Sequence, residues 1–211
     1  MTPYDYGAIA LVYDPEKIKG EMKSFEDLKK IGKVIVVEDP RSSSTGQDFL
    51  LWTIAVYKDK WKEYWKGLKP NIAAVAPGWN EAFAKLEAGE APVMVSYATD
   101  GAYSYENYKS TKYKAFLPSE GSYVQVEGSA IAAGSKNPKL AAKFIDFMLE
   151  ERFQNEIPLN QWMFPVVNVK LPDSFKYAAV PSKILNLSDA EIDKNMDTWY
   201  RDWETDRKSV V

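Results

Sequence analysis

The stretch from Lys33 to Trp52, KVIVVEDPRSSSTGQDFLLW, predicts a strand, a turn and a helix in immediate succession. Residues 34–37 form a β-branched apolar run, which is typical of a parallel strand buried on both faces. Asp39-Pro40 ends that run, and from Phe49 onward apolar residues recur at helical spacing. We therefore expect a strand–turn–helix unit of an α/β sheet.

The turn of this unit is rich in hydroxyl groups, with Ser42, Ser43, Ser44 and Thr45 ahead of Gly46. The start of a helix has unpaired N–H groups and a partial positive charge, so such a turn can hold a phosphate or a carboxylate. Ordinary capping by one Ser is the alternative interpretation. Because a cap needs a single hydroxyl, the run of hydroxyls favours a site for an anion or polar ligand.

The composition predicts a folded protein with a restricted set of chemical groups. Its 211 residues are 45% hydrophobic, enough for one large domain or two small ones. The net charge of −3, with Lys and Glu interspersed, predicts no nucleic-acid partner. The chain has no Cys and no His, so thiolate chemistry, imidazole ligation and a Ser-His-Asp triad are excluded. The charge density and the lack of cysteine also suggest a thermophilic source.

No segment approaches the roughly 20 apolar residues of a membrane span. Met1 is followed directly by TPYDYG rather than by a basic and then apolar leader, so we expect a soluble chain without a signal peptide. Aromatic residues are 14% of the chain, which predicts either an aromatic core or rings that face a ligand. The face formed by Trp61, Tyr64, Trp65 and Leu68 is predicted to be core.

Strands and helices alternate from Pro15 to Glu120, as in a doubly wound α/β sheet. We therefore expect a complete α/β lobe over residues 15–121, entered by a crossing strand over residues 1–14. Residues 122–206 are predicted to form a return crossing and the C-terminal helical part of another lobe, followed by a tail at 207–211. The last helix of that part begins near Ser188.

Aromatic residues stand at further turns of the chain. Trp79 follows Pro77-Gly78 at the first turn of a predicted helix, where a large ring is hard to bury and where βα loops of open sheets meet ligands. The strand ending at Tyr97 runs into a polar turn before Tyr103, and Trp162 lies in an apolar loop. The residues of that polar turn are Ala98, Thr99 and Asp100. From pattern alone, each ring is as compatible with the core as with a ligand.

Eight motifs occur in a characteristic order: PYDYGAIALVYD, DPRSSSTG, LLW, PGWNEAF, VSYATDGAY, SEGSYVQVEG, KNPKLAAKFIDFML and FQNEIPLNQWMFPV. Together they resemble the thiamine-binding periplasmic proteins of ABC transporters, within the type II, ferric-ion-like class of binding proteins. The resemblance extends to about Val169. It implies one complete doubly wound lobe plus a helical remainder of the other lobe, and a binding role without catalysis or a cofactor. The implied ligand is thiamine, thiamine monophosphate or thiamine diphosphate, and the implied partner of the full-length periplasmic protein is a membrane permease.

The resemblance also implies roles for individual residues. Ser43, with its neighbouring hydroxyls and Gly46, would meet the alcohol or phosphate end of the ligand. Trp79 and Tyr103 would stack on its rings, residues 97–100 would line the pocket, and Trp162 would close it. Aromatic faces suit a flat aminopyrimidine and a cationic thiazolium, and Asp100 would balance the charge or accept from the amino group.

The family's first-lobe contacts would lie upstream of Pro3, so the resemblance implies a truncated chain. An incomplete lobe exposes edges that can pair with another chain, which predicts self-association as a homodimer.

Three alternatives remain open. A ferric-ion binder of the same class would want adjacent tyrosines with a carboxylate or His, and the sequence has neither a Tyr-Tyr pair nor a His. A carboxylate-based hydrolase or transferase would use Asp39, Asp100 or Glu127, but no pattern fixes two of these at a reactive spacing. A flavodoxin-like interaction domain would bind no ligand, and the aromatic clustering around the polar turns argues against it.

Overall fold

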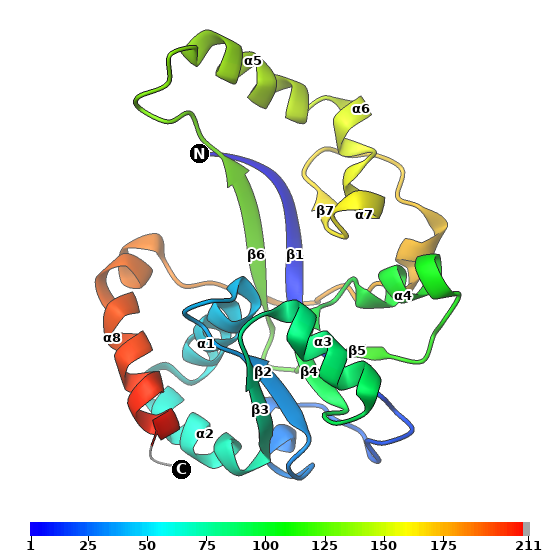
Figure 1. The fold of residues 1–211 in the computed structure, drawn as a ribbon, viewed down its shortest axis with the longest axis vertical. Coiled ribbons are helices and arrows are strands. Elements are labelled where there is room, and N and C mark those ends of the chain that lie inside the picture. Colours follow the sequence, from blue (N-terminus) through cyan, green and yellow to red (C-terminus); the bar gives the residue numbers. More distant parts are fainter. Residues whose placement is uncertain (209–211) are drawn as a thin grey trace.

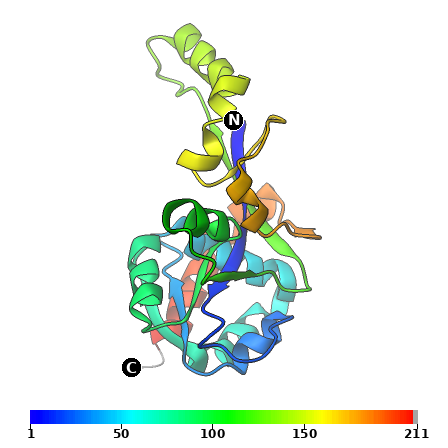
Figure 2. The same cartoon turned by 90° about the vertical axis from the view of Figure 1, so that its right-hand side faces the viewer.

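The computed structural model describes residues 1–208, with side chains through Thr205. Figure 1 shows two parts joined by a long ribbon of two strands, with a larger α/β body below and a smaller helical part above. Figure 2 shows the same separation from the side. Within the described residues, no helix has both the length and the hydropathy that a bilayer crossing requires.

The secondary structure follows the predicted alternation up to β5. The helices α3 and α5 begin and end where the sequence pattern places them, at residues 79–88 and 138–148. In chain order the elements are β1 (Thr2–Tyr13), η1 (Phe25–Lys29), β2 (Ile35–Glu38), α1 (Ser44–Tyr57), η2 (Lys58–Lys60), α2 (Trp61–Leu68), η3 (Lys69–Asn71), β3 (Ile72–Ala76), α3 (Trp79–Ala88), β4 (Val93–Tyr97), α4 (Asp100–Tyr108), β5 (Lys114–Phe116), β6 (Ser122–Ser129), α5 (Pro138–Met148), α6 (Glu151–Gln154), α7 (Ile157–Asn160), β7 (Phe164–Pro165), η4 (Asp173–Tyr177), β8 (Ile184–Leu185) and α8 (Asp189–Lys208).

The sheet is mixed rather than purely parallel, with the strand order β3-β2-β4-β1-β6-β8. Strand β2 is parallel to β3 and β4, whereas β1 is antiparallel to β4 and β6 and also pairs with β5 and β7. Because carboxyl ends of parallel strands meet at one edge, the turns after β2, β3 and β4 are brought together.

Strand β1 belongs to both parts of the molecule. Its second half, Ile9 to Tyr13, pairs with β4 inside the α/β body. Its first half pairs with β6 from Thr2 opposite Ser129 to Ala8 opposite Val124. This antiparallel pair is the ribbon that links the two parts in Figure 1, and we call it the crossing ribbon.

The main core of the α/β body is aromatic. The predicted core face of α2 is confirmed, because Trp61, Tyr64, Trp65 and Leu68 are all buried. The ring of Phe25 packs edge-on against Trp52, with centroids 4.8 Å apart. Edge-to-face pairs of this kind add to the free energy of burial. Helix α1 is therefore held between the sheet and the rings of α2.

Helix α8 returns to the α/β body, whereas the sequence analysis assigned residues 122–206 to the other lobe. Trp199 and Trp203 join the aromatic core, and Trp203 contacts Trp65 at a centroid distance of 5.9 Å. Arg41 and Glu204 form an ion pair at 2.9 Å. An amphipathic pattern predicts that one face is buried but not on which surface, which explains the difference. Of the predicted tail, residues 207–208 end α8, and residues 209–211 lie outside the described residues.

Candidate functional site

Three chain turns meet at the carboxyl edge of the parallel strands. The Ser42 hydroxyl donates a 2.7 Å hydrogen bond to the carbonyl of Pro77, which joins the turn after β2 to the turn after β3. Burial raises the pKa of Tyr97 at the end of β4, and the nearby Ser44 side chain opposes that shift. The structure therefore places the hydroxyl-rich turn beside the residues that lead into Trp79.

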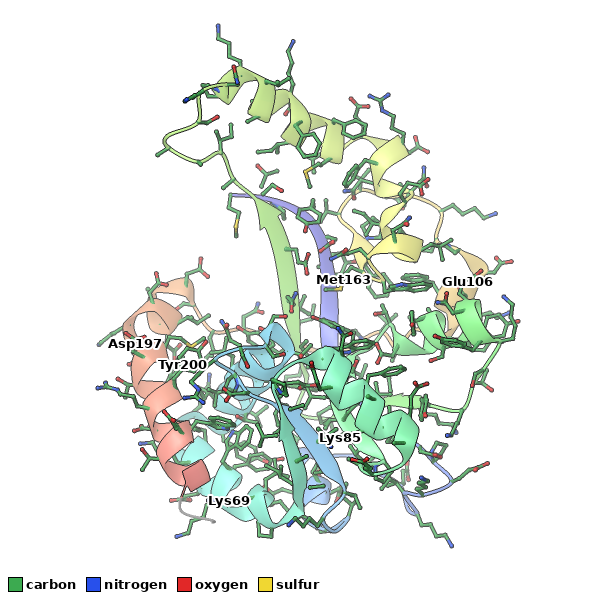
Figure 3. The ribbon with its side chains drawn as sticks, viewed as in Figure 1. Lys69, Lys85, Glu106, Met163, Asp197 and Tyr200 are labelled. Atoms are coloured by element: carbon green, nitrogen blue, oxygen red, sulfur yellow. The ribbon has the colours of Figure 1, made fainter. Side chains whose placement is uncertain are left out.

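A pocket of about 230 Å³ lies next to this edge, between the α/β body and the helical part. Six predicted site residues line it, from α3, β4, α4 and the loop after α7, namely Trp79, Tyr97, Thr99, Asp100, Tyr103 and Trp162. The sequence analysis did not place Glu127, Gln161 or Met163 in a binding site, yet they also line the pocket. Figure 3 shows Met163 beside β1, between the two parts.

The aromatic walls of the pocket hold one another in place. The rings of Trp79 and Phe83 stack with centroids 4.9 Å apart and planes within 9°. Tyr103 meets Trp162 edge-on at 5.1 Å. Trp162 has a φ of 59°, a left-handed conformation that is uncommon for a bulky residue. Such strain persists only where surrounding contacts fix it, so the position of Trp162 is determined by tertiary packing.

A short hydrogen-bonded chain runs beneath Trp79. The indole Nε1 donates to the Ser96 hydroxyl at 2.8 Å, and that hydroxyl donates to the carboxyl group of Asp100. Burial raises the pKa of Asp100 to about 7, and the hydrogen bond from Ser96 opposes that shift. Asp100 therefore changes its charge near neutral pH.

Thr99 presents an unused polar group to the pocket. Its side chain is fully buried, and its Oγ1 has no hydrogen-bond partner among the described residues. Buried polar groups in folded proteins are nearly always hydrogen-bonded. A polar atom of a bound molecule would satisfy this hydroxyl.

Glu127 is the centre of a second cluster of hydrogen-bonded side chains. Its Oε2 accepts from the Tyr4 hydroxyl at 2.8 Å and from the amide of Gln161 at 3.2 Å. Its Oε1 accepts from the amide of Gln125 at 2.9 Å. Sequence reasoning considered Glu127 only as a catalytic carboxylate, because nothing local in β6 indicates that a loop some 35 residues later meets it.

The hydroxyl-rich turn also caps α1, as the alternative interpretation required. Ser43 is the N-cap and accepts from the backbone N–H of Gly46 at 3.4 Å. Its hydroxyl also bonds that of the buried Thr45, at 2.8 Å. A side chain at Gly46 would meet the carbonyl oxygen of Glu38 at 2.6 Å, so the helix start packs tightly on β2. Ser42 and Ser44 remain exposed.

Ala98 is a packing residue in this structure. It is fully buried and clusters with Ala8 and Ala10 of β1. Its backbone N–H donates to Ala8 and its carbonyl accepts from Ala179. Neither Ala98 nor any residue of the turn 42–46 is among the residues that line the aromatic pocket.

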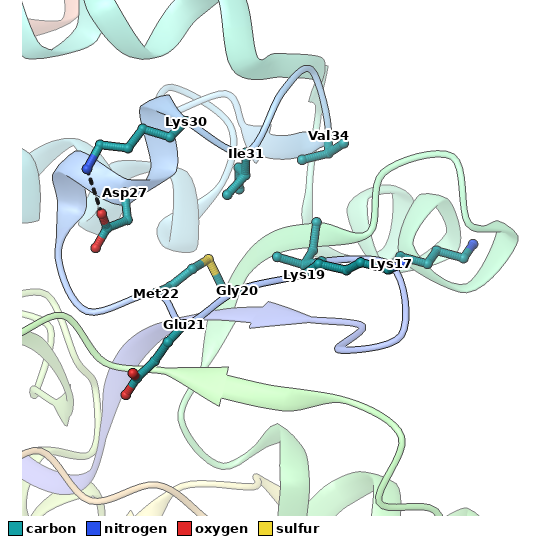
Figure 4. A pocket seen from close by; sticks show the side chains of 10 residues that line it. Lys17, Lys19, Gly20, Glu21, Met22, Asp27, Lys30, Ile31 and Val34 are labelled. Carbon is teal, nitrogen blue, oxygen red and sulfur yellow. Dashed lines mark hydrogen bonds and ion pairs between the residues drawn. The ribbon is translucent and has the colours of Figure 1, made fainter.

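A larger pocket of about 440 Å³ lies in the loop between β1 and η1, and Figure 4 shows it from close by. Its cationic side chains are Lys17, Lys19 and Lys30, and Lys30 is paired with Asp27 at 2.8 Å. None of the predicted site residues lines it. The smaller aromatic pocket is the better candidate, because rings, carboxyl groups and an unpartnered hydroxyl converge there.

Comparison with known proteins identifies the family. The model of the bacterial extracellular solute-binding proteins matches residues 1–195. This chain belongs to that family. The chain is 38% identical to the thiamine-binding periplasmic protein of Escherichia coli K12, over 97% of its own length and 63% of the relative's. It is 40% identical to the thiamine-binding periplasmic protein of Brucella melitensis, over 96% of its own length and 62% of the relative's.

Solved structures confirm the expected fold of the chain. A periplasmic thiamin binding protein superimposes with a TM-score of 0.92 at 38% identity, covering 97% of this chain and 65% of that one. A ferric binding protein from Campylobacter jejuni gives a TM-score of 0.81 at 21% identity, covering 97% and 69%, and this likeness concerns the fold alone. The fold is thus that of type II periplasmic binding proteins. The chain spans less than two thirds of the length of these thiamine-binding relatives.

The donor set gives the ferric-ion alternative little support. Among the side chains that the structure describes, those of residues 1–205, no group of three or more Asp, Glu, His or Cys is arranged to hold a metal ion. The pocket lining holds two carboxyl groups, those of Asp100 and Glu127, among aromatic side chains.

Proposed function

We propose that this solute-binding chain forms part of the thiamine site of a periplasmic protein that delivers thiamine or its phosphates to the membrane permease of an ABC importer. One observation carries the proposal. The pocket at the strand edge is walled by Trp79, Tyr103 and Trp162 in a chain that is 38–40% identical to proteins named for thiamine binding.

The chemistry of the pocket fits such a ligand. Thiamine joins a flat aminopyrimidine to a cationic thiazolium, and both rings suit aromatic walls through stacking and cation–π attraction. The Thr99 hydroxyl and the carboxyl group of Asp100 offer partners for an amino group. Exposed Ser42 and Ser44 at the start of α1 suit the alcohol or phosphate end.

We propose a binding role without catalysis. The carboxyl groups considered for an enzyme are engaged in the described structure, since Asp39 pairs with Arg41 and Asp100 accepts from Ser96. Glu127 accepts from three donors. Incubation with thiamine monophosphate should leave the phosphate ester intact, and its hydrolysis would contradict this part of the proposal.

We also propose how the chain divides into lobes. Residues 15–121 together with α8 would form one α/β lobe, and the crossing ribbon would lead to the helical part. The apolar surface of that part would be covered by a second copy in a homodimer. The side chains concerned are Leu140 and Phe144 of α5, together with Val126 of the crossing ribbon, and all three are exposed.

Isothermal titration of the purified chain with thiamine tests the function. Tyr103→Ala should weaken binding at least tenfold, because rings that anchor a ligand are worth roughly 2 kcal/mol or more. Tyr105→Ala is the matched control, because Tyr105 lies on the same helix but packs on Tyr177 outside the pocket. An absence of saturable binding by a folded wild-type chain, or an equal effect of both variants, would contradict the proposal.

A further inference from the structure

The crossing ribbon carries two carboxyl groups directly opposite each other. Asp5 of β1 and Glu127 of β6 are partners in the antiparallel register, so their side chains share one face of the ribbon. Glu127 lines the aromatic pocket, and Met163, another lining residue, packs over Gly7 of β1. Like charges opposite each other destabilise a strand pair, so this arrangement is costly to the fold.

The negative charge around Glu127 extends further. Asp5 is fully buried, and neither of its carboxyl oxygens has a hydrogen-bond partner among the described side chains. Asp48 of α1 is buried with one oxygen unpartnered. Burial, and then the charge of Glu127, raises the pKa of each to about 7. In the part of the chain that the structure describes, none of these carboxyl groups takes part in an ion pair.

Three side chains donate hydrogen bonds to the Glu127 carboxyl group, and none of the three is a cation. Neither Lys nor Arg is among the residues that line the pocket. The pocket therefore presents the Glu127 carboxyl group without a cationic side chain to balance it, beside the fully buried and unpartnered Thr99 hydroxyl.

We propose that Glu127, placed opposite Asp5 in the crossing ribbon, is a specificity-determining residue that selects solutes carrying their positive charge on a flat ring. The inference rests on the proposed thiamine site and adds the rule by which the site rejects uncharged analogues. A cationic ring supplies the missing counter-charge while it lies between the aromatic walls. A neutral ring of the same shape covers the Glu127 carboxylate and leaves it with its three hydrogen bonds but without a counter-charge, which is costly.

The test compares thiamine with its neutral analogue in which a thiophene ring replaces the thiazolium. Titrations run at pH 8, above the pKa of about 7 of Asp5. The wild-type chain should prefer thiamine by roughly tenfold or more, the scale of one close charge pair. Glu127→Gln should reduce that preference to within about threefold, mainly by weakening thiamine binding. Glu151→Gln removes the same charge from an exposed position of α6 outside the pocket and should keep the full preference.

Two results would overturn the inference while leaving the thiamine site intact. One is equal affinity of the wild-type chain for both compounds, and the other is an unchanged preference in folded Glu127→Gln. If that variant does not fold, Asp5→Asn provides the test instead. It removes only the neighbouring charge and should lower the preference for thiamine over the neutral analogue several-fold. Binding of neither compound by the wild-type chain would overturn the proposed function itself.

Discussion

The indole nitrogen of Trp79 donates a 2.8 Å hydrogen bond to the hydroxyl of Ser96. Trp79 begins α3, whereas Ser96 is fully buried in β4. The bond therefore ties a pocket ring to the buried interior of the sheet. Stacking on Phe83 supports the ring from its other side, so both the position and the tilt of Trp79 are fixed before a ligand arrives.

Ser96→Ala should loosen this ring. The change leaves the Nε1 of Trp79 and an oxygen of buried Asp100 without their partner, at a cost of about 1–3 kcal/mol in stability. Thiamine affinity should fall roughly tenfold because the ring is no longer held in place. Titration calorimetry and urea unfolding measure the two effects. Ser122→Ala is the control and should keep wild-type affinity, because Ser122 begins β6 and does not line the pocket. Unchanged affinity in Ser96→Ala would show that the bond does not position Trp79.

Stability should rise as the pH falls from 8 to 5. The folded-state pKa values of Asp5, Asp48 and Asp100 are raised to about 7 from an ordinary value of 3.8, chiefly by burial. Between these values the folded state binds more protons than the unfolded state. The stabilisation is complete below the unfolded pKa and is lost as the pH rises through about 7.

Thermal melts between pH 5 and pH 8 check this dependence. Each kcal/mol corresponds to roughly 2–4 °C in Tm for a chain of this size, so the trend should be readily measurable. Asp48→Asn removes one of the three groups and should make Tm less dependent on pH. A Tm that is constant, or higher at pH 8, would show that these carboxyl groups are not protonated on folding.

Gly7→Ala should disturb the pocket through Met163, which lines it. A β-carbon at this position would collide with the sulfur of Met163, which is buried. Overpacking of this kind costs typically 1–3 kcal/mol. Because Met163 follows Trp162 in the chain, thiamine affinity should fall as well. The double variant Gly7→Ala/Met163→Ala, which removes the collision, should recover part of the stability measured by urea unfolding. If the double variant recovers no stability, the collision with Met163 is not the source of the strain in Gly7→Ala.

The helical part should drive self-association. Leu140 and Phe144 of α5 are 66% and 58% exposed, which is unusual for neighbouring large apolar side chains on one helix. Light scattering with size-exclusion chromatography should detect dimers at micromolar concentration. Leu140→Glu/Phe144→Glu should yield monomers, whereas Lys143→Glu changes the net charge equally and should not. A wild-type chain that is monomeric at this concentration would contradict the homodimer.

Local sequence patterns were sufficient for most helices and strands. The apolar period of residues 79–88 and 138–148 predicted α3 and α5, because 3.6-residue periodicity is a property of the segment itself. The hydroxyl-rich turn was likewise readable as a helix start. The Glu127 side chain was not identified as part of the pocket, since its neighbours Tyr4 and Gln161 are distant in sequence.

The sequence by itself determined the elements of this protein, its aromatic core face on α2 and its chemical inventory, which lacks both Cys and His. Only the tertiary structure decided that α8 packs on the α/β body and that Asp5 stands opposite Glu127. The physical reason is that strand register and helix docking depend on contacts between segments more than a hundred residues apart. Periodicity shows that a face is buried, but the partner of that face is selected by the shape and charge of the assembled fold.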